Sequence, residues 1–423
     1  MKLKFFDIKN KLFADSFWAL LGNVIYKGLL LLSGIIIARI LGKDIFGEFS
    51  IIKSTFVSLA LLSSFGLGYT VTKFISDYKE RKPDKLHGIF FYSQKIVLIL
   101  SSVVCLIVIL NSQKIAVNIL ENSSLEYFVK YASVLIILNC LNLLYVGFLA
   151  GLGLFKKMAK INATIGLIAF VLLTSLTYFF GIKGALLALA IVQLINVVIN
   201  YIVIKKNLPK PLYKKDLKTQ QSIVKYSIPI ALQEAVYASI SWLVSYLIIY
   251  YSSYGELGLY TAAIQLNAII LFIPGILRNV VLSHLSGVSN NKLEHNNVLN
   301  TILKLNIIVT LIPCLLIFVF NHYVSNLYGE TFIGLERLIR LAIFTTVFIS
   351  ISNVYAQAYM SKNLNWTMFG FRLVRDLGKI LLFVILINLE MKGSEAMVIS
   401  HLILAGVFMV IMMSYYKYKE SRT

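Results

Sequence analysis

The 423-residue sequence has very few charged residues and very few cysteines for its length. Only 14% of its residues are charged, against roughly 25% in soluble domains, and 58% are hydrophobic. A soluble core cannot take up so much apolar material without leaving large patches exposed. The composition therefore excludes a soluble enzyme, a disordered chain, a coiled coil and a disulfide scaffold.

Recognisable catalytic and metal-binding motifs are also missing. Cys105, Cys140 and Cys314 all lie in apolar runs and form neither a CxxC pair nor a zinc-type spacing. The five histidines are scattered, and no Walker A, HExxH, GxSxG or Rossmann glycine pattern occurs in a suitable context. We therefore expect a protein that is not an enzyme, that binds no cofactor or metal, and that does not drive itself with ATP.

The sequence does contain twelve apolar segments separated by short polar linkers. A helix needs ~20 residues to cross a bilayer and satisfies its own backbone hydrogen bonds in lipid. The predicted fold is therefore an all-α integral membrane protein with about twelve transmembrane helices. The expected spans are 16–40, 46–74, 88–111, 127–151, 161–180, 184–204, 223–251, 258–283, 298–320, 337–360, 365–388 and 395–416.

Basic residues are distributed unevenly between alternate loops. The chain has 40 Lys and Arg against 19 acidic residues, a formal net charge of +21. Twenty-two of the basic residues lie in one set of loops, which includes both termini, and only four lie in the other set. Because basic loops stay on the cytoplasmic side, we expect both termini in the cytoplasm and no nucleic-acid partner.

The chain shows a weak internal repeat around its most basic loop. That loop, 205–222, reads KKNLPKPLYKKDLKTQQS and falls midway along the sequence. An offset of 211 residues aligns Gly47 with Gly258, Phe49 with Tyr260, Asn23 with Glu234 and Ser63 with Pro274. We therefore expect an N-terminal six-helix bundle at 1–204, a cytoplasmic linker at 205–222 and a C-terminal six-helix bundle at 223–423. Parallel repeats of this kind recur in transporters.

Several stretches resemble one family of membrane proteins over essentially the whole chain. They are the first span bearing Asn and Lys, then ARILGKDIFGEFSIIKS, FGLGYTVTKFISDY, YSIPIALQE, YGELGLYTAA and LYGETFIGLERLIRLA. These stretches resemble the polysaccharide repeat-unit flippases of the Wzx type (O-antigen and capsule exporters), which share a superfamily with the MATE multidrug exporters. The resemblance implies two pseudo-symmetric six-helix bundles around a central cavity. It also implies transfer of an undecaprenyl-diphosphate-linked oligosaccharide from the inner to the outer leaflet.

Ionisable residues inside spans are costly, about 2.5–3.5 kcal/mol each on insertion scales, and therefore informative. Lys27 lies near the middle of the first span, and Asn23 lies one turn before it on the same helical face. The lysine charge and the amide donor can together bind an anion. The alternative is a snorkelling lysine, although Lys27 is more than ten residues from either end of the span.

The eleventh span carries four ionisable residues. Arg372, Arg375, Asp376 and Lys379 share one helical face. The two arginines suit bidentate binding of a diphosphate, and we expect Asp376 to pair with Arg372 or Lys379. The alternative is an ion-pair stripe that only holds helices together.

Two further residues complete the candidate site. Glu234 lies in the middle of the seventh span, where a carboxylate can couple transport to a proton or sodium gradient; the alternative is a fixed partner for a cation such as Lys27. Arg278 follows Pro274 by one turn near the cytoplasmic end of the eighth span. It can receive the diphosphate on entry or simply snorkel.

These observations predict a flippase in the cytoplasmic membrane that works by alternating access and is coupled to an ion gradient. Its expected partners are the undecaprenyl-diphosphate-linked oligosaccharide, H⁺ or Na⁺, membrane lipids, and polysaccharide polymerase and chain-length proteins. Two alternatives remain: a MATE-type cation-coupled exporter of small amphiphiles, and a membrane enzyme acting on the lipid-linked glycan.

Overall fold

The structure is a computed structural model, and it describes residues 2–208, 217–275, 281, 285, 292–362 and 364–422. Across these ranges the regular structure is helical throughout. The elements are α1 (Lys2–Ser63), α2 (Leu67–Arg81), η1 (Pro83–Lys85), α3 (Leu86–Leu110), α4 (Ser112–Lys114), η2 (Ile115–Ile119), η3 (Ser123–Leu125), α5 (Glu126–Ala132), α6 (Val134–Leu152), α7 (Phe155–Asn207), α8 (Leu217–Tyr251), α9 (Tyr254–Gln265), α10 (Asn267–Ile270), α12 (Lys292–Val319), α13 (Asn321–Asn326), α14 (Leu335–Ser361), α15 (Asn365–Asn388) and α16 (Gly393–Arg422).

The first two expected spans lie in one long element, α1, which changes direction at Gly42. Gly42 has φ 72° and ψ 167°, a conformation that glycine adopts without a steric cost. The second span is broken again farther along, because Phe65 and Gly66 both have positive φ values, 53° and 63°. The helix resumes as α2 at Leu67, so the span expected at 46–74 is a discontinuous helix.

The fifth and sixth expected spans form the two arms of α7. Gly181, with φ 55° and ψ −138°, interrupts the helix between them. A Cβ at Gly184 would lie 1.8 Å from the carbonyl oxygen of Leu176. Only glycine allows the chain to pass so closely back over the first arm.

The eighth expected span is also discontinuous. The side chain of Ser253 accepts a hydrogen bond from the backbone N–H of Glu256 and caps the start of α9, as N-cap serines do. The helix is then interrupted at Leu266 and at Leu271, on either side of α10.

The helix lengths support insertion in a membrane. Eight helices in the described ranges are long and apolar enough to cross a bilayer, and they contain ten of the twelve expected spans because α1 and α7 hold two each. The exceptions are the broken eighth span and α15, which carries four ionisable residues. The prediction of an all-α integral membrane protein is therefore confirmed.

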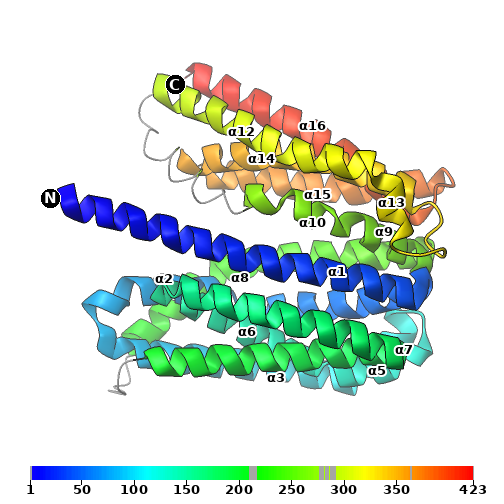
Figure 1. The fold of residues 1–423 in the computed structure, drawn as a ribbon, viewed down its shortest axis with the longest axis horizontal. Helices are drawn as coiled ribbons and strands as arrows, with labels where there is room; N and C mark the ends of the chain where they lie inside the picture. Colours follow the sequence, from blue (N-terminus) through cyan, green and yellow to red (C-terminus); the bar gives the residue numbers. More distant parts are fainter. Residues whose placement is uncertain are drawn as a thin grey trace. The chain divides into compact units, whose positions relative to one another are not determined.

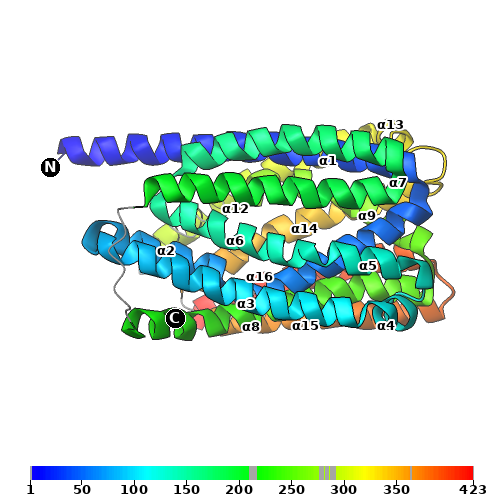
Figure 2. The same ribbon diagram turned by 90° about the horizontal axis from the view of Figure 1, so that it is seen from below.

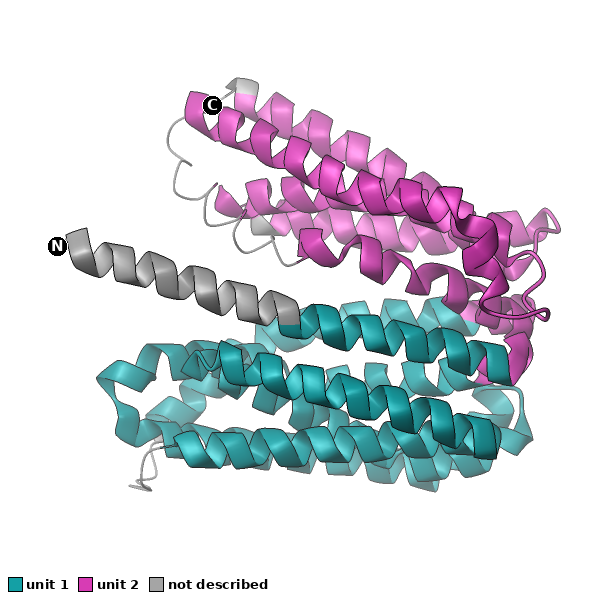
Figure 3. Cartoon of the chain, in the orientation of Figure 1, with its two compact units in different colours: residues 1–40, 49–246 teal, residues 41–48, 247–423 magenta. Residues whose placement is uncertain are grey.

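The chain divides into two compact units, 1–40 with 49–246 and 41–48 with 247–423 (Figure 3). In unit 1, α6 packs against α2, α3 and α7, and these helices run side by side (Figures 1 and 2). A Cβ at Gly147 of α6 would lie 2.1 Å from the carbonyl oxygen of Gly68 in α2. This close approach of two backbones is the kind of helix contact that small residues permit in membranes.

Unit 2 is built around α14, which packs against α12, α16 and α9, while α15 packs against α16 (Figure 1). Tyr355 and Tyr359 of α14 form a buried cluster with Met412 and Tyr416 of α16. The Tyr359 hydroxyl donates to the carbonyl oxygen of Met412 at 2.8 Å, so the polar end of this buried ring is satisfied.

Residues 41–48 pack inside unit 2 through two glycines that the 211-residue offset aligns. A Cβ at Gly47 would lie 1.9 Å from the carbonyl oxygen of Tyr254, and a Cβ at Gly258 would lie 2.0 Å from the carbonyl oxygen of Lys43. Lys43 and Tyr254 are themselves 211 residues apart. The contact is therefore reciprocal, as a twofold relation between repeats requires.

Candidate functional site

Asn23 and Lys27 lie on α1 beside the first arm of α7. A Cβ at Gly22 would lie 2.4 Å from the Cα of Ala159, so these two helices are in close backbone contact. Asn23 is half-buried and accepts a hydrogen bond of 3.3 Å from the side-chain amide of Asn162. Lys27, one turn farther along, is exposed. Of the polar pair predicted from the sequence, Asn23 is therefore held by a hydrogen bond and Lys27 is exposed.

Helix α8 contacts α1 and α2 along an antiparallel register. Thr70 and Ser227, both fully buried, share a hydrogen bond of 2.8 Å between their hydroxyls. Fifteen residues farther along α8, the indole N–H of Trp242 donates to the hydroxyl of Thr55 at 2.9 Å. These contacts group α8 up to residue 246 with unit 1.

The same register sets Glu234 at the level of Ser63, where α1 ends. Glu234 is half-buried. Ser63 and Ser64 donate their hydroxyl hydrogens to the carbonyl oxygens of Leu59 and Leu61, at 2.7 and 2.8 Å. The C-terminal end of a helix carries partial negative charge on its carbonyl groups. Glu234 is thus placed at the level of a helix break rich in oxygen atoms.

A polar strip of α8 is exposed beside Glu234. Gln233, Tyr237 and Ser241 follow one another at four-residue intervals, which puts them on one face. Tyr237 is 64% exposed, and Gln233 and Ser241 are also exposed. Polar side chains on an exposed stretch of a spanning helix are typical of a surface that meets water rather than acyl chains.

The charged stripe of α15 lies in unit 2, and its four residues are all half-buried. Arg375 donates to Asp376 from its Nε at 3.0 Å and forms an ion pair through a terminal nitrogen at 2.9 Å. Asp376 is thus paired with Arg375, a partner not expected from the sequence, and it also attracts Lys379 electrostatically. Neighbouring helical residues do not face each other, but the long arginine side chain curls back to reach the shorter carboxylate. Lys379 stays within electrostatic range of both residues.

The apolar side of α15 holds this stripe in place. Phe371 packs against Tyr359 in a tilted arrangement and against Tyr415 edge to face, with ring centroids 5.9 and 5.5 Å apart. A Cβ at Gly378 would lie 3.2 Å from the Leu404 side chain of α16. One face of α15 is thus fixed by α14 and α16, while its cations lie along the adjoining face.

His401 is the residue that sequence reasoning missed. It lies on α16 one turn before Leu404, on the side that faces α15, and Lys379 and Arg375 act electrostatically on its imidazole. The sequence offered only one signal, a histidine inside an apolar span. Twenty-two residues separate it from Lys379, and only the pairing of α15 with α16 brings them together.

A second polar group outside the prediction is an amide network in unit 1. Asn142 of α6 donates to Gln193 of α7 at 2.7 Å, and Asn200 donates to Asn142 and to Asn196 at 3.0 and 2.9 Å. Asn196 and Asn200 are buried, and the network is satisfied internally. Its role is to join α6 to α7, as interhelical amides do in membranes.

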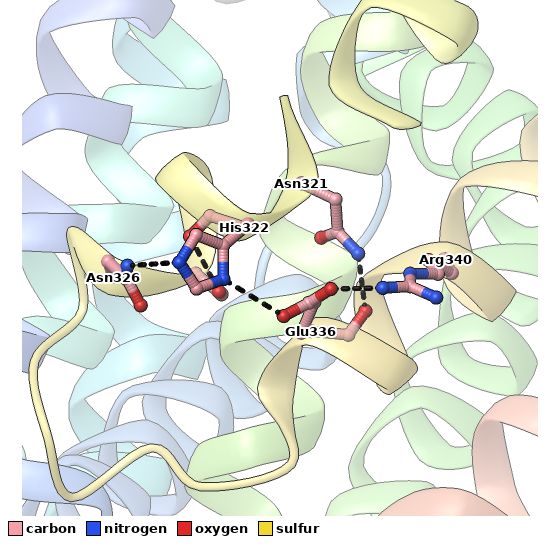
Figure 4. Close-up of polar contacts among 6 residues, drawn as sticks. Asn321, His322, Asn326, Glu336 and Arg340 are labelled. Carbon is pink, nitrogen blue, oxygen red and sulfur yellow. Dashed lines mark hydrogen bonds and ion pairs between the residues drawn. The ribbon is translucent and has the colours of Figure 1, made fainter. Parts of the chain in front are cut away.

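The LYGETFIGLERLIRLA stretch organises the start of α14 (Figure 4). Glu336 pairs with Arg340, one turn farther along, and with His322 of α13 at 3.3 Å. Asn326 contacts the other ring nitrogen of His322 at 3.1 Å, and Asn321 donates to the backbone carbonyl of Glu336 at 2.7 Å. These contacts fix α13 against α14.

Two predicted features need separate mention. Arg278 lies outside the described residues. Within the described part of the chain, no group of three or more His, Cys, Asp or Glu side chains could hold a metal ion. The cysteines Cys105, Cys140 and Cys314 are buried and free.

Comparison with known proteins agrees with this architecture. Two family models, both described as polysaccharide biosynthesis protein, match residues 12–286 and 292–423. No curated protein matches the chain.

Solved structures of transporters share the fold. An inward-facing multidrug resistance MATE family transporter of the MOP superfamily gives a TM-score of 0.80 at 14% identity, with 94% of each chain covered. A MOP superfamily transporter from Pyrococcus furiosus gives 0.72 at 13% identity, and an outward-facing MATE family transporter gives 0.71 at 15%; both comparisons cover 98% of this chain and 96% of the other. The fold is therefore that of the MATE transporters, and the chain belongs to the family of polysaccharide biosynthesis proteins, as the resemblance to Wzx-type flippases indicates.

Proposed function

We propose that this protein is a flippase that moves an undecaprenyl-diphosphate-linked oligosaccharide repeat unit from the cytoplasmic to the outer leaflet. The observation that carries the proposal is the half-buried stripe of α15, in which three cations accompany a single carboxylate in a spanning helix. Asp376 is already paired with Arg375, so the stripe keeps an excess of positive charge. In a polysaccharide biosynthesis family, a diphosphate-linked sugar is the anion that such an excess suits.

The physical role of these cations is to lower an electrostatic barrier. A diphosphate headgroup crossing bare lipid meets a low-dielectric medium in which charge is very costly. Arg372 and Arg375 offer planar donors that suit phosphate oxygens, and Lys379 adds a flexible point charge. In unit 1, Lys27 and Asn23 are proposed to supply a fourth cation and an amide. Arg278, in the eighth span, is proposed to receive the headgroup on entry.

Glu234 is the proposed coupling residue. Its place level with the broken end of α1 combines a carboxylate with serine hydroxyls and helix C-terminal carbonyl groups. Discontinuous helices with exposed carbonyl ends bind Na⁺ or protons in other transporters. Binding of H⁺ or Na⁺ there would link the ion gradient to the conformation of α8.

The proposed cycle is alternating access. The six-helix halves, 1–204 and 223–423, joined by the basic linker 205–222, rock about the central site while the lipid tail stays in the bilayer. The protein would then lie in the cytoplasmic membrane with both termini inside, close to the polymerase and chain-length proteins that use its product.

One reconstitution experiment tests the proposal against both alternatives. Purified protein is placed in vesicles with a fluorescent polyprenyl-diphosphate oligosaccharide, and the outward fraction and the mass of the lipid are followed. Flipping without a change of mass supports the flippase. A changed mass supports a membrane enzyme. Transport of small cationic amphiphiles without glycan flipping supports the MATE-type exporter.

Variants of the α15 ion pair separate binding from structure. Arg375→Ala leaves Asp376 without its partner inside the membrane, so loss of transport alone is ambiguous. The double variant Arg375→Ala/Asp376→Asn removes both charges. We expect it to fold like the wild type and still to flip the glycan several-fold more slowly. Wild-type flipping by a well-folded double variant would contradict diphosphate binding at Arg375.

A further inference from the structure

His401 is placed by helix packing at the edge of the proposed anion site. Leu404 of α16 touches Gly378 of α15, and His401 lies one turn before Leu404 on the same face. Lys379 follows Gly378 directly in the chain. The imidazole is half-buried, and it lies within electrostatic range of Lys379 and Arg375.

Within the described part of the chain, the charged groups that act on the His401 ring lie on α15. Lys379 and Arg375 act on its ring. The carboxylates on the other elements packed against α16 are engaged elsewhere: Glu256 of α9 accepts a hydrogen bond from Ser394, and Glu336 of α14 pairs with Arg340. The remaining titratable groups on these elements are of two kinds. The first are phenols on α9 and α14: Tyr254, Tyr260, Tyr355 and Tyr359. The second lie near helix ends: Arg337 at the start of α14, Glu395 at the start of α16, and Tyr415, Tyr416, Lys417, Tyr418, Lys419 and Glu420 toward the end of α16.

The imidazole also has open hydrogen-bonding capacity. Among the residues that the structure describes, neither ring nitrogen of His401 hydrogen-bonds to another group. The nearby Asp376 is bonded to Arg375 instead. A half-buried ring with two open nitrogens beside two cations offers a donor to an anion that those cations attract.

We propose that His401 is a third, proton-dependent member of the anion site. It donates a ring N–H to the diphosphate held by Arg375 and Lys379, and it takes up a proton as the diphosphate binds. The inference rests on the proposed function, because it names a further ligand of that same site.

The physical reason is electrostatic linkage. In the empty site, the two neighbouring cations oppose a third positive charge on the imidazole. A bound diphosphate brings two negative charges and reverses that balance. Histidine can change its charge within the physiological range of pH. Because linkage is reciprocal, the proton strengthens diphosphate binding by the same factor by which diphosphate strengthens proton binding.

The test is calorimetric titration of the full-length protein in nanodiscs with a polyprenyl-diphosphate monosaccharide. Its doubly esterified diphosphate does not itself titrate near neutral pH. Repeating the titration in two buffers with different ionisation enthalpies gives the number of protons taken up on binding. His401→Gln and His401→Asn remove the titrating ring and keep a polar side chain. His322→Gln, which changes an exposed histidine on α13, is the matched control.

The wild type and His322→Gln are expected to take up a measurable fraction of a proton per lipid, at most about one, and to bind more tightly as pH falls, by at most about tenfold per unit. Both His401 variants are expected to bind several-fold more weakly and to lose the uptake. Equal uptake in folded His401 variants, or no uptake in the wild type, overturns the role of His401 alone. Failure of the folded wild type to bind the lipid overturns the proposed anion site itself.

Discussion

At the residue scale, two polar side chains of the candidate site are held by a neighbouring side chain. Asp376 is held by Arg375, and Asn23 by Asn162. Lys27 is exposed, near the middle of an apolar helix. Leaving such a charge in a bilayer is costly, so its presence favours a role in contact with a polar cargo over a role in packing.

Lys27→Ala is expected to slow glycan flipping by about tenfold or more without changing the yield of folded protein. A hydrogen bond to a charged group contributes about 1.5–3 kcal/mol, and each 1.4 kcal/mol corresponds to about tenfold. The measurement is the initial flipping rate in vesicles. Lys27→Arg should retain most of the rate, and Lys114→Ala, in a loop between spans, should retain all of it. An unchanged rate in Lys27→Ala would remove this residue from the site.

Glu234→Gln is expected to uncouple transport from the ion gradient. Glutamine keeps the shape and hydrogen-bonding capacity of the side chain but cannot exchange a proton or neutralise a cation. Flux in vesicles should then no longer respond to an imposed proton or sodium gradient, whereas the wild type should respond to one of them. Gln233→Glu/Glu234→Gln, which moves the carboxylate by one position, controls for net charge and should not restore coupling. A Glu234→Gln protein with wild-type gradient dependence would reject the coupling role.

At the element scale, glycines decide where helices bend and where they touch. Gly42, Gly66 and Gly181 occupy conformations with positive φ, and Gly47 and Gly258 allow residues 41–48 to lie directly against the start of α9. The linkers predicted between spans at 41–45 and 181–183 contain Gly42 and Gly181. The sequence pattern did not reveal the second break, at Phe65 and Gly66, because a run of apolar and small residues continues through it.

Gly47→Ala is expected to destabilise the protein, because the new Cβ would lie 1.9 Å from the Tyr254 carbonyl oxygen. Overpacking of this kind costs about 1–3 kcal/mol, which should appear as a lower unfolding temperature of the detergent-solubilised protein. Gly88→Ala is the control, since a Cβ there meets nothing within 4 Å. Equal stability of the two variants would show that the glycine crossing tolerates a side chain.

At the scale of the whole molecule, family and fold agree on a membrane transporter of the polysaccharide biosynthesis class. The uneven distribution of Lys and Arg between alternate loops predicts the orientation of the protein in the membrane. A reporter enzyme that is active only in the cytoplasm is expected to be active when it is fused after Thr423. A reporter enzyme that is active only outside the cytoplasm is expected to be active when it is inserted after Lys392. The reverse pattern at Thr423 would contradict the orientation and the even number of spans.

The sequence by itself determined the membrane-embedded helical class, nearly all of the spans, and which polar residues share a helical face. These properties follow from composition and from the local period of 3.6 residues. Only the tertiary structure decided that Asp376 pairs with Arg375, that α8 lies along α1 and α2, and that His401 lies beside Lys379. Such choices depend on how each helix is rotated against its neighbours. That rotation is set by close contacts, such as Gly378 on Leu404, between residues far apart in the chain.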